Sequence, residues 1–240
     1  TGNVVITLDY IKTAFSADNI TVLLRSLEYA LITTIICLLL SYPAAMFLSK
    51  LKSNIGAIIC LLFILPMWIN FLLRVLALQM ILANTGILNG ILNFFGLPSQ
   101  HLLYTRTAIL IGMTYDYLPF MILPIYNAMC KIDRDLIHAA ADLGAGSKLI
   151  FRKIILPLSM PGVISGIIMV FVPSISEFAI ADILGGSKIL LIGNVIEQEF
   201  SLTNNWHLGS GLSIVLMVFI FISMAVMNKN DAEGEGQMIW

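Results

Sequence analysis

Long apolar runs alternate with short polar connections along this chain. A helix that crosses a membrane needs about 20 mostly apolar residues. We expect a transmembrane helix wherever a run approaches that length. The expected spans are Tyr29–Leu48, Ile55–Leu73, Thr107–Met129, Ile154–Ile175 and Leu208–Met227. The pattern therefore predicts an all-α membrane protein with five spans, in which residues 1–228 form a single transmembrane domain.

Basic residues are divided unevenly between the connections on the two sides of the membrane. Lys and Arg are enriched in cytoplasmic loops. The richer set is Lys50, Lys52, Lys131, Arg134, Lys148, Arg152, Lys153 and Lys229. The poorer set is Lys12, Arg25, Arg106 and Lys188. We expect the richer side, and with it the C-terminus, to be cytoplasmic. Residue 1 would then lie outside, and since no signal peptide is visible we expect a sixth span before it.

The remaining connections differ in character. Leu82–Arg106 contains the stretch NTGILNGILNFFGL, which Gly and Asn interrupt. We expect it to form a short helix that lies in the interface or re-enters the membrane. The segment Glu177–His207 is an outer connection with acidic residues. The stretch 229–240 is polar, acidic and glycine-bearing, so we expect a disordered tail there.

Composition supports a membrane protein and excludes several functions. The chain has 240 residues, of which 59% are hydrophobic and 11% charged, whereas soluble domains carry about 25% charged residues. No basic patch large enough to bind nucleic acid is present. The three cysteines have no metal-binding spacing. A phosphate-binding GxxxxGK[ST] loop is absent from the sequence, so we expect neither an enzyme nor a cofactor or metal bound by this chain.

The most specific polar segment is the cytoplasmic loop at about 131–153. Asp133 or Asp135 can cap a helix start, and Leu136, Ala140 and Leu143 share one helical face. Gly144 can adopt the left-handed turn that ends a helix. We expect Ser147 to cap a second helix, and Pro157 and Pro161 to kink the entry to the next span. This helix–turn–helix is either an ordinary amphipathic loop or a surface that another protein binds.

The same loop resembles the EAA loop of ABC importer permeases. The family pattern is Glu-Ala-Ala, three residues, Gly, nine residues and Ile-x-Leu-Pro. Ala139-Ala140, Gly144 and Ile154-Ile155-Leu156-Pro157 match it, while His138 stands where the family usually has Glu. The polar contact that the family's Glu makes is therefore not carried over to this position.

Other stretches resemble one branch of that family, the B-type permease subunits of spermidine/putrescine importers. The matching stretches are Pro66-Met67-Trp68-Ile69-Asn70 with Arg74, TGILNGIL, Leu118-Pro119-Phe120 and GGSKILLIGNVI. The resemblance implies a type I ABC importer helix bundle in a bacterial cytoplasmic (inner) membrane. It also implies a second homologous permease, two ATPase subunits that bind ATP and Mg, an extracytoplasmic binding protein and transport by alternating access. The ATPase-coupling residues would be His138, Ala139, Ala140, Asp142, Leu143 and Gly144.

Acidic and aromatic residues near the spans suggest where a substrate passes. Asp116 lies in the middle of the third run, where a charge costs about 2.5–3.5 kcal/mol, so it should face a polar cavity or pair with Arg74 or Arg106. Carboxylates and aromatic faces attract ammonium groups, and a polyamine carries several. The candidate pathway residues are Trp68, Tyr115, Asp116, Tyr117, Glu177 and Asp182. Glu177 and Asp182 could instead lie in solvated loops, and Trp68 could be an interfacial anchor.

Two alternative functions stay open. An importer of the same class could carry another cargo, such as a phosphonate or ferric ion, although acidic residues along the path argue against an anion. A stand-alone secondary transporter would show inverted repeats, which are not clear in this sequence. Gly162 and Gly166 form a G-x-x-x-G pattern, which allows close helix packing within the chain or against a partner.

Overall fold

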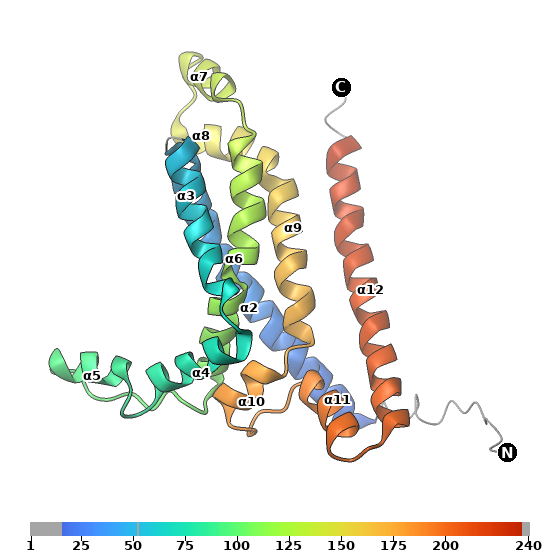
Figure 1. Ribbon diagram of the computed structural model, residues 1–240. Coiled ribbons are helices and arrows are strands. Elements are labelled where there is room, and N and C mark those ends of the chain that lie inside the picture. The colour runs from blue at the N-terminus through green and yellow to red at the C-terminus, as the bar shows by residue number, and fades with distance from the viewer. Residues whose placement is uncertain (1–15, 52, 237–240) are drawn as a thin grey trace. The chain divides into compact units, whose positions relative to one another are not determined.

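The computed structural model describes residues 16–51 and 53–236, and for 53–54 and 226–236 it describes the backbone alone. The described residues form helices and no strand (Figure 1). Their contacts divide the chain into two compact units. The first unit comprises Thr1–Leu31, Leu72–Met113 and Val172–Ala225. The second unit comprises Ile32–Phe71, Thr114–Phe171 and Val226–Trp240. Predictions about residues 1–15 and 237–240 lie outside the described residues.

Helix α2 is longer than its apolar run. It covers Ala17–Lys50 and therefore begins well before the predicted start at Tyr29. Ser26, Tyr29 and Ala30 are buried, and their spacing places them on one face of the helix. A search for uniformly apolar runs misses this segment because Asp18, Asn19, Arg25 and Glu28 interrupt it. Arg25, which we assigned to a connection, lies within α2 and donates a hydrogen bond to the Leu190 carbonyl at 3.4 Å.

The second predicted span, Ile55–Leu73, is wrong as a continuous helix. The chain instead forms α3 (Ser53–Ile64), the 3₁₀ turn η1 (Leu65–Trp68) and α4 (Phe71–Leu82). Pro66 has no N–H and its ring crowds the carbonyl four residues earlier, which favours a break in the helix at this position. Ile69 is extended, with φ −77° and ψ 142°, and a new helix begins after it.

The short helix expected within Leu82–Arg106 is confirmed as α5 (Ile87–Phe94). It follows α4 after a turn at residues 83–86. Together α4 and α5 make up the apolar segment Phe71–Phe94, which is long enough to cross a membrane. The predicted number of five membrane-length apolar segments agrees with the described residues, but the second segment lies further along the chain than predicted.

The other spans lie close to their predicted positions. They are α6 (Arg106–Cys130), α9 (Leu156–Ile175) and α12 (Trp206–Gly236). The backbone of α12 remains helical to Gly236, although a disordered tail was expected from residue 229. Once a helix is nucleated, each further residue adds one hydrogen bond, and Ala232, Glu233 and Glu235 are residues compatible with a helix.

In the second unit α3, α6 and α9 run side by side (Figure 1). A Cβ atom at Gly162 of α9 would lie 2.5 Å from both the Pro124 carbonyl oxygen and the Ala128 Cβ of α6. A Cβ atom at Gly166 would lie 2.7 Å from the Met121 sulfur. The G-x-x-x-G pattern therefore allows α9 to pack closely against α6 within the chain, which settles one of the two alternatives in favour of an internal contact.

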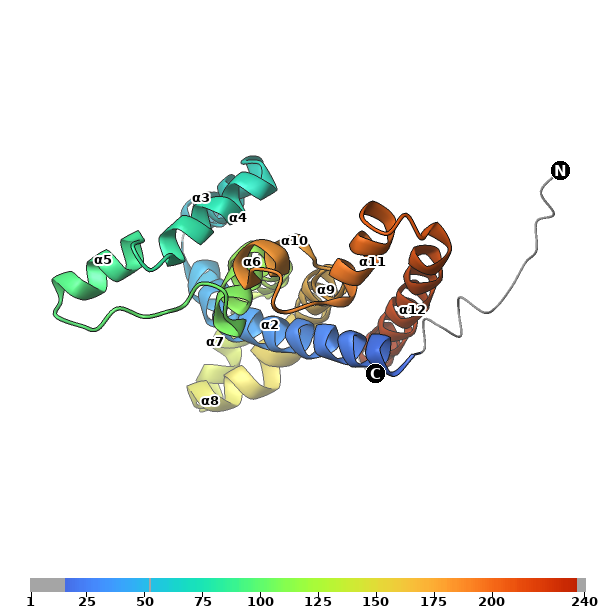
Figure 2. The same cartoon turned by 90° about the horizontal axis from the view of Figure 1, so that it is seen from below.

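The first unit contains two helices where the sequence suggested only an outer connection. They are α10 (Ala179–Gly185) and α11 (Ile192–Ser201). Helix α11 lies beside α12 (Figure 2), where a Cβ atom at Gly209 would lie 3.0 Å from the Phe200 ring. The helices α2 and α6 are joined in this unit by the ion pair of Glu28 with Arg106.

Candidate functional site

The loop between α6 and α9 begins with α7 (Arg134–Asp142), whose two ends are fixed by local chemistry. The Asp133 carboxylate accepts a hydrogen bond from the Asp135 backbone N–H at 2.9 Å, which caps the helix start. Gly144 has φ +82°, a value that a residue with a side chain adopts only with strain. Both features confirm the prediction from the sequence.

The second half of the loop differs from the prediction in one detail. Helix α8 (Ser147–Ile150) has Gly146 rather than Ser147 at its N-cap, and no side chain caps it. It continues into the π-helical turn η2 (Phe151–Ile155) and then α9. Pro157 lies just after this turn and cannot donate a backbone hydrogen bond, which accounts for the irregular helix at the entry to the span.

Helix α7 presents two different faces. Residues along an α-helix turn by about 100° each, so Leu136, Ala139 and Leu143 lie on one side of α7. Leu136 is 51% exposed and Leu143 is 89% exposed. Arg134 and His138 lie on the opposite side. The loop thus exposes an apolar face on one side and directs polar groups into a cavity on the other.

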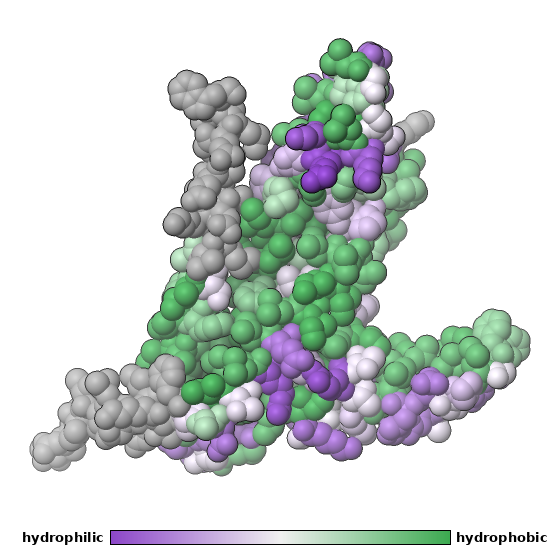
Figure 3. All heavy atoms as spheres, turned by 180° about the vertical axis from the view of Figure 1, so that it is seen from behind, coloured by the Kyte–Doolittle hydropathy of each residue, from purple (hydrophilic) through white to green (hydrophobic). Residues whose placement is uncertain are grey.

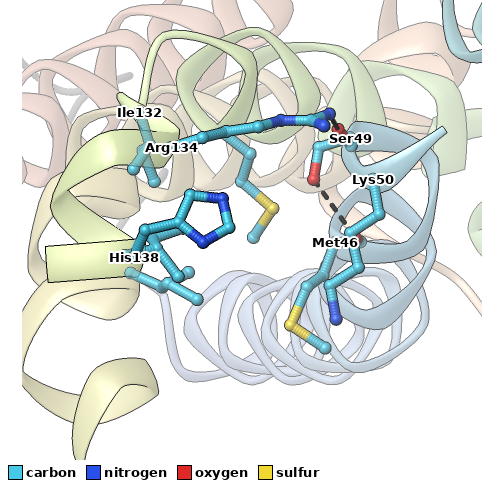
Figure 4. Close-up of a pocket in the computed structure, with 9 residues that line it drawn as sticks. Met46, Ser49, Lys50, Ile132, Arg134 and His138 are labelled. Atoms are coloured by element: carbon cyan, nitrogen blue, oxygen red, sulfur yellow. Dashed lines mark hydrogen bonds between the residues drawn. The ribbon is translucent and has the colours of Figure 1, made fainter. Parts of the chain in front are cut away.

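The cavity lies between α7 and the ends of α2, α6 and η2, all within the second unit (Figure 4). Its volume is about 260 Å³. The Arg134 guanidinium extends across it and donates to the Ser49 carbonyl at 3.3 Å, while the imidazole of His138 points into it. The lining residues are Met46, Ser49, Lys50, Met129, Ile132, Arg134, Ile137, His138 and Ile155.

The structure brings the predicted coupling residues together at one exposed end of the second unit. Ala140 is half-buried, and the other five are exposed: His138, Ala139, Asp142, Leu143 and Gly144. Figure 3 shows hydrophilic residues gathered where this loop lies, next to the largely apolar surface of the spans of the same unit. The loop is therefore accessible to another protein.

Four of the predicted pathway residues belong to the second unit. Asp116 and Tyr117 are buried near the middle of α6, and Tyr115 beside them is 44% exposed. Trp68 ends η1 and is 80% exposed. Helix α3 ends at Ile64, just before Pro66. Of these four residues, Asp116 combines a charge with a buried position on a spanning helix.

The other two pathway candidates belong to the first unit and have local hydrogen bonds. Glu177 is buried, and its Oε1 accepts a hydrogen bond from the Ile180 backbone N–H at 3.0 Å, at the start of α10. Asp182 is exposed and accepts a hydrogen bond from the Ser187 hydroxyl. The carboxylate of Glu177 therefore has a structural role, because it accepts a hydrogen bond at the start of α10.

Sequence reasoning missed the basic cavity behind α7. Part of the cavity could have been predicted, because Arg134, Ile137 and His138 have the spacing of one helical face. Lys50 ends α2, far away in the sequence, so its approach to them could not be foreseen. No cluster of three or more His, Cys, Asp or Glu side chains that could hold a metal ion occurs among the residues described.

Comparison with protein families defines the class of this chain. Residues 16–231 match the family described as the binding-protein-dependent transport system inner membrane component. The chain belongs to this family of multi-pass membrane permeases. Relatives in the family include the spermidine/putrescine transport system permease protein PotB of Escherichia coli, which is 39% identical over 228 residues. That match covers 90% of this chain and 83% of the relative.

A second relative and two solved structures agree with this assignment. PotB of Haemophilus influenzae is 42% identical over 223 residues, covering 92% of this chain and 78% of the relative. A bacterial ABC transporter that imports the acidic polysaccharide alginate has a TM-score of 0.69 at 16% identity, covering 96% of this chain and 85% of that chain. A bacterial alginate ABC transporter in complex with an alginate-bound periplasmic protein has a TM-score of 0.69 at 18% identity, covering 93% of this chain and 82% of that chain. The fold is the type I ABC importer permease bundle.

Proposed function

We propose that this chain is the permease subunit of an ATP-driven importer of polyamines such as spermidine and putrescine. The relatives named for that transport are 39–42% identical over about nine-tenths of the chain. The alginate transporter has the same fold, so the bundle by itself does not set the cargo. The carboxylate of Asp116, buried in a spanning helix, supports a cationic cargo because intramembrane carboxylates mark ion and substrate pathways by default.

The observation that carries the coupling proposal is the exposed apolar face of α7. Leu136 and Leu143 are exposed at a loop outside the spans. Apolar side chains that protrude in this way mark surfaces for protein partners. We propose that a separate ATPase subunit binds this face, together with His138, Ala139 and Asp142. ATP and Mg would be bound by that subunit, and this chain would transmit its movement to the spans.

The complete importer would contain a second homologous permease, two ATPase subunits and an extracytoplasmic binding protein. The loop that contains α7 would face the cytoplasm, as would the C-terminus, since Lys148, Arg152 and Lys153 lie in this loop and positive charge favours the cytoplasmic side. The substrate path would pass Asp116 and Tyr115 in α6, with Trp68, Tyr117, Glu177 and Asp182 along it. Alternating access would open this path to one side at a time.

The test is uptake of labelled spermidine into liposomes that contain the assembled transporter and internal ATP. We expect Asp116→Asn to reduce uptake about tenfold, which corresponds to the loss of one charged contact of about 1.5 kcal/mol. Asp18→Asn is the matched control, because Asp18 is exposed in the first turn of α2. Unchanged uptake by Asp116→Asn would remove the proposed role of this carboxylate.

Two further results would contradict the proposal at different levels. If a phosphonate or ferric ion is carried and spermidine is not, the cargo is wrong although the class stands. If this chain reconstituted alone accumulates solute against a gradient, the proposed dependence on a separate ATPase is wrong.

A further inference from the structure

The cavity behind α7 is rich in positive charge. Lys50 and Arg134 line it together with His138. Of the described residues that line it, none carries a carboxylate. The acids of α7 lie elsewhere: Asp133 caps the helix, and Asp135 and Asp142 are exposed outside the lining. A cavity with this charge attracts an anion.

The rest of the lining is apolar. Met46, Met129 and Ile155 contribute hydrocarbon and thioether surface, as do Ile132 and Ile137. A free inorganic anion gains nothing from such walls, since its interactions are purely polar. An amphiphile with a charged head and an apolar tail suits both kinds of surface. The volume of about 260 Å³ lies just below the ~300 Å³ at which sites for drug-sized molecules begin, so it fits a headgroup rather than a whole lipid.

The cavity is built from the ends of spanning helices. Lys50 is the last residue of α2, Met129 lies one residue before the end of α6, and Ile155 immediately precedes α9. The 25 residues of α6 span about 37 Å at 1.5 Å per residue, which exceeds the ~30 Å hydrocarbon core. The ends of such a helix therefore reach the level of the lipid headgroups.

The two faces of α7 make a lipid a better occupant than a protein partner. The apolar face of Leu136 and Leu143 is turned away from the cavity, so a protein bound there would not need the basic groups behind the helix. Arg134 instead faces the ends of the spans and donates to the Ser49 carbonyl near the end of α2. Basic pockets between transmembrane helices on the cytoplasmic side bind anionic lipid headgroups.

We propose that the cavity lined by Lys50 and Arg134 binds the phosphate headgroup of an anionic phospholipid, with the start of its acyl chain against Met46, Met129 and Ile155. The guanidinium fork of Arg134 matches the geometry of a phosphate, and the Lys50 ammonium adds a second charge. The bound lipid fills the space between α7 and the span ends, and so fixes the base of the loop. This site is separate from the transport path and adds to the proposed function.

The experiment measures lipids that remain on the assembled transporter. The transporter is reconstituted with equal amounts of phosphatidylethanolamine and phosphatidylglycerol, extracted, and analysed by native mass spectrometry. We expect retained phosphatidylglycerol in the wild type and at least about tenfold weaker retention in the double variant Lys50→Gln/Arg134→Gln. The matched control is Lys148→Gln/Arg152→Gln, which removes two charges from exposed residues of the same loop outside the cavity.

A second variant guards against misfolding. Lys50→Glu places a carboxylate in the cavity from the exposed end of α2 and should also reduce retention, while co-purification of the partner subunits reports an intact assembly. Equal loss in the cavity and control variants would overturn the proposal, as would retention without preference for phosphatidylglycerol. Binding of inorganic phosphate that needs Lys50 and Arg134, without lipid retention, would assign the cavity to a free anion. Loss of the ATPase with unchanged lipid retention would assign it to a protein partner.

Discussion

The hydroxyl oxygen of Ser26 in α2 lies 2.7 Å from the backbone nitrogen of Ile192 and accepts a hydrogen bond from it. Both residues are buried. Ile192 is the first residue of α11, where the backbone N–H groups have no partner inside the helix. The Ser26 hydroxyl supplies that partner from a distant helix and so fixes the start of α11 against α2 in the first unit.

Replacement of Ser26 by Ala should destabilise the protein. The buried N–H of Ile192 would lose its acceptor, at a cost of about 1–3 kcal/mol. We expect a lower midpoint of thermal unfolding for the purified protein in detergent. The control is Ser223→Ala, because the Ser223 hydroxyl donates to the Phe219 carbonyl within its own helix. Equal midpoints for the two variants would show that the Ser26 hydrogen bond contributes no more to stability than the hydrogen bond of Ser223 within its own helix.

The same substitution should have opposite effects at two glycines. Gly162→Ala would bring a Cβ atom to 2.5 Å from the Pro124 carbonyl oxygen and should force α9 away from α6, with a loss of about 1–3 kcal/mol. A Cβ atom added at Gly90 in α5 would have no other atom within 4 Å. Gly90→Ala should therefore stabilise the helix by about 0.5–1 kcal/mol. Unfolding in a denaturant series tests both variants. A stable Gly162→Ala protein would disprove the close packing.

Two variants of Glu177 separate its structural and transport roles. Glu177→Gln keeps a side-chain oxygen that can accept from the Ile180 N–H, so we expect nearly unchanged stability. Glu177→Ala removes that acceptor and should lower stability by about 0.5–2 kcal/mol. If the charge also serves the cationic substrate, Glu177→Gln should reduce spermidine uptake roughly tenfold, as for a charged contact of about 1.5 kcal/mol. Wild-type uptake by the Gln variant would leave Glu177 with its structural role alone.

The exposed apolar face of α7 should be needed for assembly. We expect Leu143→Ala to weaken co-purification of the ATPase about tenfold and to reduce ATP-dependent uptake, because a buried leucine at an interface contributes about 1.5–3 kcal/mol. Leu202→Ala is the control, since Leu202 is 73% exposed at the end of α11. The coupling proposal fails if both variants retain the ATPase equally.

The sequence alone determined the features that depend on neighbouring residues or on the membrane. The apolar runs of α6, α9 and α12 were found nearly where the structure has them, because lipid requires uniformly apolar helices of a fixed minimum length. The Asp133 cap and the left-handed Gly144 followed from residues within one turn of each other. The family pattern around Gly144 and Pro157 indicated the class of protein for the same reason, since it is a local motif.

Only the tertiary structure decided features that join distant segments. The early start of α2 depends on the burial of Ser26 and Tyr29, which cannot be predicted from the length of an apolar run. The break at Ile69 had a local cause in Pro66, but where the next helix begins depends on its packing. The cavity behind α7 needs Lys50 and Arg134 to meet across 83 intervening residues. The sequence gives the type of each side chain, whereas the packing of the helices determines which side chains become its neighbours in space.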